Sequence, residues 1–482
     1  MATSVQDKDL CPDQTLARGL PFKDLWIKLR PFSLPRPVVR PGCAGLVLLA
    51  FALLALFSPT AQAKNLIRDA EIEYAMAKLA RPVLSAAGLP AGRIKILIIE
   101  DSALNAFVMD SQHIFINSGL ILKLKTPEQL QAVIAHEAAH IANGHISRRL
   151  SNIGTANTAA KLGLLLATAV IASGHGDAGA GIAVGAAASA HRVLLSHTRS
   201  EEASADQSGV RYLARAGIDP AAMVEVLNMF KDQEALSLGR RDPYALTHPL
   251  SRQRLRAVKG YAAAYKPRGK PDSQTAYWYA RARGKLGAFI RHSKWGLHEA
   301  KATPYKDVAT MMRAVAYHGK PDIKRALAEI NRLIKMRPKD AYAHELKGQI
   351  LLETRQSAAA VAAYGRAVAL APDQPLILAG YGRALLAQKN YGKALSVLRK
   401  ARARDPFDAR MMRDLALAYA KTGNNGMASL ATAERYAMQG RLKDAGIHAK
   451  RAAGLLPRGS TGWNRAQDVL RAAENAKNKK RR

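Results

Sequence analysis

The chain has 482 residues, a length that is typical of two or three domains. Lysine and arginine outnumber aspartate and glutamate by 73 to 37, and the excess is spread along the whole sequence. Such a charge would suit anionic lipid headgroups or nucleic acid, but the sequence has no zinc-finger spacing, no RNA-binding aromatic signature and no single basic helix. We therefore interpret the charge as a basic, solvated surface and expect no nucleic-acid partner.

The N-terminal segment resembles an export signal. An uncharged apolar run, AGLVLLAFALLALF, occupies residues 44–57 and is followed by Ala61-Gln62-Ala63. This pattern predicts a signal peptide with an A-x-A cleavage site, so residues 1–63 would be an N-terminal extension and signal peptide, and the mature, exported chain would begin near Lys64. The alternative is an uncleaved inner-membrane anchor, but a run of about 14 residues is short for a span of roughly 20.

The only two cysteines, Cys11 and Cys43, lie in the segment that we expect to be removed. The mature chain would therefore have no thiol, which excludes cysteine as a nucleophile or metal ligand. Any metal site must use histidine, aspartate and glutamate.

Residues 64–265 alternate helical and short strand signals. Isoleucine-rich runs at residues 94–99 and 113–116 are typical of β-strands, and Asn117-Ser118-Gly119 marks the end of the second run. A few strands among several helices predict an α+β domain.

The most informative motif is His136-Glu137-Ala138-Ala139-His140. Residues 126–129 form a capping box with proline at the first helical position, so a helix should begin there and end near Gly144. His136 and His140 then share one helix face and can approach one metal ion. Glu137 lies beside them and could act as general base on a water molecule. The alternative is a surface helix with incidental histidines.

A catalytic zinc ion needs a third protein ligand. Some proteases place glycine three and histidine six residues after the second ligand, but here those positions are Asn143 and Ile146, and His145 is one residue early. The other known solution is a glutamate from a second helix. Glu202 and Asp206 share a helix face, so Glu202 can bind the metal while Asp206 accepts an imidazole N–H group.

A composition rich in proline, glycine and lysine predicts a linker over residues 266–273. Residues 274–472 are rich in alanine and leucine and are expected to be helical, with a basic tail over 473–482. Prolines in this part recur every 34 residues, and an alanine stands twelve residues before each: Pro338, Pro372 and Pro406, with Ala326, Ala360 and Ala394. This pattern resembles the tetratricopeptide repeat, whose units stack into a solenoid with a concave groove. A generic helical bundle is the alternative.

The segments HEAAHIANGH, TRSEEASADQSG, ARAGIDP and THPLSRQR begin at His136, Thr198, Ala214 and Thr247. Together with the repeats, they resemble the zinc metallopeptidase family that contains HtpX and the prenyl-protein CAAX proteases, and within it the exported, repeat-bearing BepA type. The resemblance covers essentially all of the mature chain. It implies a zincin-like α+β metalloprotease domain followed by an all-α tetratricopeptide-repeat solenoid.

The resemblance also implies functional residues. It makes His136, His140 and Glu202 the ligands of one Zn2+ per chain and Glu137 the catalytic base. Residues Asn105-Ala106-Phe107 resemble the family's edge strand, which would hold an extended substrate by β-addition. Family members often have paired glycines just after this strand, whereas Asp110-Ser111 stands here, so the shape of the substrate edge can differ.

Two features leave alternatives open. His248 lies in a loop that the resemblance brings near the metal, and it could be a fourth ligand that closes the site, an oxyanion stabiliser or a structural residue. The apolar stretches 162–171 and 179–190 are each too short to span a bilayer. They predict either a mobile helical cover over the cleft or a surface in peripheral contact with a membrane.

These features predict a periplasmic zinc-dependent endopeptidase. The resemblance implies quality control of outer-membrane proteins, with the repeats docking unfolded or misassembled substrates or the assembly machinery. The chief alternative is a chaperone or adaptor whose repeats bind proteins while proteolysis is minor or absent. A membrane-embedded prenyl-protein protease would need several apolar spans of about 20 residues, which the mature sequence lacks.

Overall fold

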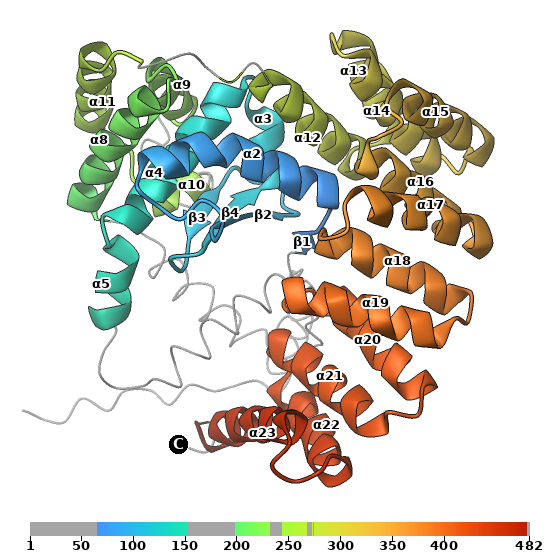
Figure 1. The fold of residues 1–482 in the computed structure, drawn as a ribbon. Helices are drawn as coiled ribbons and strands as arrows, with labels where there is room; N and C mark the ends of the chain where they lie inside the picture. Colours follow the sequence, from blue (N-terminus) through green and yellow to red (C-terminus); the bar gives the residue numbers. More distant parts are fainter. Residues whose placement is uncertain (1–64, 153–197, 232–242, 268–271, 273, 480–482) are drawn as a thin grey trace, which may run out of the picture. The chain divides into compact units, whose positions relative to one another are not determined.

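The computed structural model describes residues 65–152, 198–231, 243–267, 272 and 274–479 (Figure 1). The predicted signal segment, the apolar stretches 162–171 and 179–190, and parts of the predicted linker and tail lie outside the described residues. Within the described ranges, no helix is both long enough and apolar enough to cross a membrane.

The N-terminal half contains a four-stranded mixed sheet with the strand order β1-β2-β4-β3. Strands β2 (Lys95–Ile99) and β4 (His113–Asn117) run parallel at its centre. The short strands β1 (Leu66–Ile67) and β3 (Ala106–Val108) pair antiparallel at the two edges. Both predicted strands are therefore present, and β3 is an edge strand.

Helices cover one face of this sheet, where alternate isoleucines of β2 and β4 pack against α2 (Ala70–Ala86) and α4 (Pro127–Ala142) (Figure 1). Helix α8 (Arg199–Arg215) lies along α4. The remaining described helices of this half are α3 (Ser118–Lys123), α5 (His145–Asn152), α9 (Ala221–Met229), α10 (Pro243–Thr247) and α11 (Arg252–Ala264). The predicted α+β class is confirmed.

Helix α4 begins and ends where the sequence predicts. Thr126 Oγ1 accepts a hydrogen bond from the backbone N–H of Gln129 at 3.3 Å, and Pro127 occupies the first turn. The capping box differs in its reciprocal half, because Gln129 Oε1 accepts from the N–H of Lys125 at 2.8 Å. Gly144, with φ of +69°, lets the chain turn after the helix.

The C-terminal half is helical throughout its described residues. After α12 (Thr275–Ile290) and α13 (Ser293–Ala302), consecutive helices pair in antiparallel hairpins. These pairs are α14 (Lys306–Gly319) with α15 (Ile323–Met336), α16 (Ala341–Glu353) with α17 (Ser357–Leu370), α18 (Pro375–Ala387) with α19 (Tyr391–Arg404), α20 (Ala409–Lys421) with α21 (Asn425–Met438), and α22 (Leu442–Leu455) with α23 (Thr461–Lys479).

The repeat pattern has a clear structural basis. Each of the three periodic prolines stands just after the second helix of a pair, and each periodic alanine is fully buried. Gly348 lies where two helices cross, since a β-carbon there would approach the ring of Tyr364 to 2.6 Å. The prediction of a tetratricopeptide-repeat solenoid is confirmed.

Helix α12 connects the two halves through buried charges. Lys285 on α12 is completely buried, and its Nζ lies 2.8 Å from Asp69 and 3.2 Å from Glu71, both near the start of α2. The same ammonium lies 3.6 Å from Glu345 of α16. Because α12 also packs against α2 and α14, it contacts both halves. The domain boundaries at residues 265 and 274 stay predictions.

Candidate active site

Helix α4 carries the H-E-x-x-H motif into the protein interior. His136, Glu137 and His140 are all completely buried, so the motif does not lie on a surface helix. The two histidines are one turn apart, and their Nε2 atoms lie 3.1 Å from each other. Both imidazoles therefore face the same point, as the i,i+4 spacing predicts.

Helix α8 supplies the acidic residues. It begins with a complete capping box, in which Thr198 and Glu201 each accept a hydrogen bond from the backbone N–H of the other. Glu202 and Asp206 follow on one helix face and are both buried against α4. A β-carbon at Gly209 would lie 3.0 Å from the side chain of Met223 and 3.4 Å from main-chain atoms of Ala135 on α4.

Four buried side chains converge on one point: His136, His140, Glu202 and His248. Nε2 of His136 lies 3.4 Å from Glu202 Oε2 and 3.2 Å from His248 Nδ1. Oε1 of Glu202 lies 3.3 Å from His140 Nε2 and 2.9 Å from His248 Nδ1. We call these four residues the ligand cluster.

The ligand cluster fits a zinc ion. Ligand atoms at the corners of a tetrahedral zinc site, with bonds of about 2.1 Å, are about 3.4 Å apart. Five contacts within the cluster, from 2.9 to 3.4 Å, are close to that value, and one ligand atom from each of the four residues lies within 4.8 Å of the other three. Imidazole nitrogens and a carboxylate oxygen are also the donors that zinc prefers where no thiolate is present.

Asp206 and Arg254 hold the ligands from behind. Asp206 Oδ1 lies 3.0 Å from Nδ1 of His136, where its negative charge favours a proton on Nδ1 and leaves Nε2 for the metal. Arg254 on α11 donates two hydrogen bonds to Asp206, at 2.5 and 2.9 Å, and its Nη1 lies 2.6 Å from Glu202. Burial alone would raise the pKa of Asp206, but Arg254 and His136 hold it below its ordinary value.

Glu137 has a different environment. Both of its carboxylate oxygens are buried, and neither has a hydrogen-bond donor among the described residues. Nε2 of His248 lies 3.4 Å from Oε1 of Glu137. Burial raises the pKa of Glu137, although His248 and His136 oppose this effect. A buried carboxylate with unused acceptor sites is unfavourable for stability and is typical of a functional group.

His248 is positioned by the short helix α10. Its backbone N–H donates to the carbonyl of Tyr244 at 2.8 Å, and the planes of the two rings are tilted by 33° with centroids 4.5 Å apart. While Nδ1 points into the ligand cluster, Nε2 lies 3.2 Å from the carbonyl oxygen of Ala106. His248 therefore contacts both the ligand cluster and strand β3.

The predicted substrate edge lies beside this loop. Ala106 and Phe107 belong to β3, and Asn105 precedes it and lies 3.3 Å from the hydroxyl of Thr247. Asp110, just after β3, accepts the backbone N–H groups of Gln112 and His113 at 2.7 and 2.8 Å. The aspartate thus closes the turn between β3 and β4.

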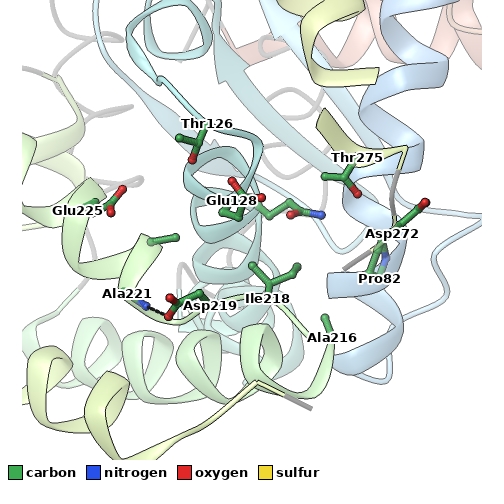
Figure 2. Close-up of a pocket in the computed structure, with 12 residues that line it drawn as sticks. Pro82, Thr126, Glu128, Ala216, Ile218, Asp219, Ala221, Glu225, Asp272 and Thr275 are labelled. Carbon is green, nitrogen blue, oxygen red and sulfur yellow. Dashed lines mark hydrogen bonds between the residues drawn. The ribbon is translucent and has the colours of Figure 1, made fainter. Parts of the chain in front are cut away.

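A separate pocket of about 350 Å³ lies at the start of α4, next to the α8–α9 turn and the start of α12 (Figure 2). Four carboxylates line it, from Glu128, Asp219, Glu225 and Asp272. None of the ligand-cluster residues lines this pocket, so it is distinct from the candidate active site.

The contacts of two residues of the site are not predictable from the sequence. Arg254 is part of the segment THPLSRQR, but its partner Asp206 is 48 residues away. His145 was considered only as a metal ligand, and it is buried against His140 outside the ligand cluster. The only sequence signal for His145 is that a further histidine follows directly after the H-E-x-x-H helix, where its side chain could contact the imidazole of His140.

Comparison with known families identifies the class of protein. Residues 67–262 match the model of peptidase family M48, and residues 311–375 and 351–416 match two models of the tetratricopeptide repeat. The chain therefore carries a peptidase M48 domain, of a zinc-dependent family, followed by tetratricopeptide repeats.

Individual relatives give a more specific comparison than the family models. The chain is 26% identical to the beta-barrel assembly-enhancing protease of Yersinia pestis over 359 residues, which is 72% of either chain. It is 25% identical to the protease of the same name from Escherichia coli K12 over 358 residues, again 72% of either chain. It is also 25% identical to the mitochondrial metalloendopeptidase OMA1 of Schizosaccharomyces pombe over 187 residues, 38% of this chain and 51% of that one.

Two solved structures show limited similarity to part of this chain. A structure of MamA has 16% identity and a TM-score of 0.28, and the match covers 36% of this chain and 97% of that one. YrrB, a tetratricopeptide-repeat protein, has 18% identity and a TM-score of 0.29, with 36% and 91% covered.

Proposed function

We propose that this chain is a zinc-dependent endopeptidase of the periplasm that acts on misfolded or misassembled outer-membrane proteins. The observation that carries the proposal is the buried ligand cluster beside the carboxylate of Glu137, to which no described residue donates a hydrogen bond. We assign one zinc ion to His136, His140 and Glu202.

The side chains around the cluster suit peptide hydrolysis. When bound, zinc supplies Lewis-acid polarisation of the peptide carbonyl and of the attacking water. Glu137 would accept a proton from that water and donate it to the leaving amine, and the raised pKa of this carboxyl suits both transfers. Asp206 would keep the proton of His136 on Nδ1, so that Nε2 stays directed at the cluster.

For His248, the contacts favour the first of the three roles, that of a fourth ligand that closes the site. We call this role the latch. Its Nδ1 occupies the fourth corner of the ligand cluster, and its Nε2 faces the Ala106 carbonyl on the predicted substrate strand. An extended substrate would need both places. The ring must therefore leave before such a substrate can pair with β3 and reach Glu137.

Zinc content and cleavage of casein by the purified protein, with Glu137→Gln as the matched control, test the activity. We expect about one zinc per chain in both proteins and cleavage only by the unmodified chain. Zinc without cleavage would indicate a closed latch, and His248→Ala would then be the next variant. Absence of zinc from metal-replete protein would contradict the proposal and favour the chaperone or adaptor.

The cellular assignment is supported by the names of the relatives and by the repeats. Cells that produce the Glu137→Gln protein should retain outer-membrane barrel proteins bound to it after cross-linking, whereas a variant lacking the repeats should not. Equal rescue of barrel assembly by Glu137→Gln and by the unmodified chain would instead favour the chaperone. N-terminal sequencing tests export, because the exported protein should begin near Lys64.

A further inference from the structure

His145 lies directly behind the metal-facing His140. The chain turns at Gly144, where φ is +69°, and this turn places His145 at the start of α5. The side chain is buried, and its ring meets that of His140 nearly edge-on, with centroids 4.9 Å apart and an angle of 69° between the planes. His140 thus has the ligand cluster on one side and His145 on the other.

The contacts continue from His145 into helix α8. Nδ1 of His145 lies 2.9 Å from Nδ1 of His140, and its Nε2 lies 3.1 Å from the hydroxyl of Ser204. That hydroxyl donates to the carbonyl oxygen of Glu201 at 3.2 Å. The chain of contacts therefore starts at one ligand, His140, and ends at the residue that precedes another, Glu202.

The positions of the protons along this series of hydrogen bonds follow from one condition, that Nε2 of His140 binds the metal ion. When Nε2 of His140 binds a metal ion, its proton must be on Nδ1, which donates to Nδ1 of His145. Nδ1 of His145 is then an acceptor, so the neutral ring carries its proton on Nε2 and donates it to Ser204. The serine hydroxyl can still donate to the Glu201 carbonyl, so each of these three bonds has one donor and one acceptor.

Asn143 supports the same arrangement. Its Nδ2 lies 3.4 Å from Ser204 Oγ and 3.3 Å from Ser208 Oγ, so the end of α4 is tied to the middle of α8. These contacts keep the Ser204 hydroxyl opposite His145. Together with a contact from Asn143 Nδ2 to the Ser204 carbonyl at 3.4 Å, they connect the two helices that carry the three assigned zinc ligands.

We propose that His145 is a positioning residue, which fixes the tautomer and orientation of His140 through an ordered hydrogen-bond chain to Ser204 and Glu201. The proposal rests on the assignment of zinc to the ligand cluster. In it, His145 positions His140 as Asp206 positions His136. Loss of such an outer partner typically weakens metal binding by about 10–100-fold.

The test measures the zinc dissociation constant of the full-length protein by competition with a chromophoric chelator. His145→Phe keeps a planar ring but removes both hydrogen bonds, and we expect zinc binding to weaken by about 10–100-fold. His145→Asn keeps an acceptor near the position of Nδ1 and should restore part of the affinity. Ser204→Ala removes only the second bond and should have a smaller effect. The matched control is His298→Phe, because the side chain of His298 is 81% exposed.

A second readout applies even if His145→Phe does not fold. Nitrogen-15 spectra of histidine-labelled, zinc-loaded protein should show His145 with an unprotonated Nδ1 and a protonated Nε2. The opposite tautomer would overturn the proposal, as would zinc binding by folded His145→Phe within twofold of the unmodified chain. If the unmodified chain binds no zinc, the proposed function itself fails. If it binds zinc and cleaves casein while His145→Phe binds zinc equally well, only this inference fails.

Discussion

Nη1 of Arg254 lies 2.6 Å from Oε2 of Glu202 in an environment from which water is almost entirely excluded. The same guanidinium holds Asp206 through two hydrogen bonds and reaches the carbonyl oxygens of His248 and Pro249 at 3.3 and 3.1 Å. One side chain therefore positions an assigned zinc ligand, the partner of a second ligand and the loop that carries His248.

Arg254→Ala should strongly destabilise the protein. It leaves two buried carboxylates without their cation, and breaking a buried ion pair in this way costs about 3–5 kcal/mol of unfolding free energy. Arg254→Lys keeps the charge but loses the planar fork, so its effect should be intermediate. Urea unfolding of zinc-free protein measures this. Arg256→Ala, on the same helix but exposed, is the control and should change stability by less than about 0.5 kcal/mol. Equal stability of the two alanine variants would contradict the prediction.

His248→Ala should increase proteolysis. Removing the imidazole opens the fourth corner of the ligand cluster and releases the Ala106 carbonyl, so the initial rate of casein cleavage at saturating zinc should rise several-fold. Zinc affinity should fall at the same time, because four donors become three. The double variant with Glu137→Gln should be inactive. A loss of cleavage in zinc-loaded His248→Ala would instead support the oxyanion role.

Lys285→Met should loosen the contact between the two halves. Burial alone would lower the pKa of Lys285, but Asp69, Glu71 and Glu345 raise it above its ordinary value, so the ammonium stays charged. Methionine would leave these carboxylates without that cation, at a cost of about 3–5 kcal/mol of unfolding free energy. Thermal and urea unfolding measure this loss. Lys294→Met changes an exposed lysine and should be nearly neutral; an equal effect of both substitutions would rule out a special role for Lys285.

Glu345 should make stability depend on pH. Burial raises its pKa from 4.5 to about 7 although Lys285 opposes this. The folded chain therefore binds this proton more tightly than the unfolded chain does. The resulting stabilisation is complete below pH 4.5 and is lost as the pH rises through 7. Relative to the unmodified chain, Glu345→Gln should thus gain stability between pH 5 and pH 8 (about the range where the proton is lost). Urea titrations at several pH values test this, and parallel pH curves for the two proteins would contradict it.

Local sequence patterns predicted much of the candidate site. The spacing of His136 and His140 places both rings on one helix face, and the same rule joins Glu202 to Asp206. The repeat was also readable, because each unit contacts mainly its neighbours and the small residues recur at fixed positions. Such patterns depend on nearby residues only.

Other features depend on tertiary contacts that a single sequence does not show. Arg254 has no local pattern that indicates a partner 48 residues away. His145 does not have the spacing of a third ligand. Only the turn at Gly144 brings its ring against that of His140. Lysine is almost never fully buried unless it is paired, so composition would place Lys285 at the surface. Its burial depends on carboxylates from α2 and α16, which are distant in the sequence.

The contact of His248 with the carbonyl oxygen of Ala106 influences which polypeptides this enzyme would leave uncleaved. Under the latch that we propose, a substrate must replace the contact between His248 and this oxygen with main-chain hydrogen bonds of its own. A peptide of two or three residues has few main-chain donors and acceptors for such hydrogen bonds. A correctly folded protein already uses its main-chain donors and acceptors within its own sheets and helices. A long segment that has lost its strand partners has many. The resting enzyme would therefore ignore small peptides and intact neighbours and respond to unpaired strands, which is how an unfinished β-barrel differs from a finished one.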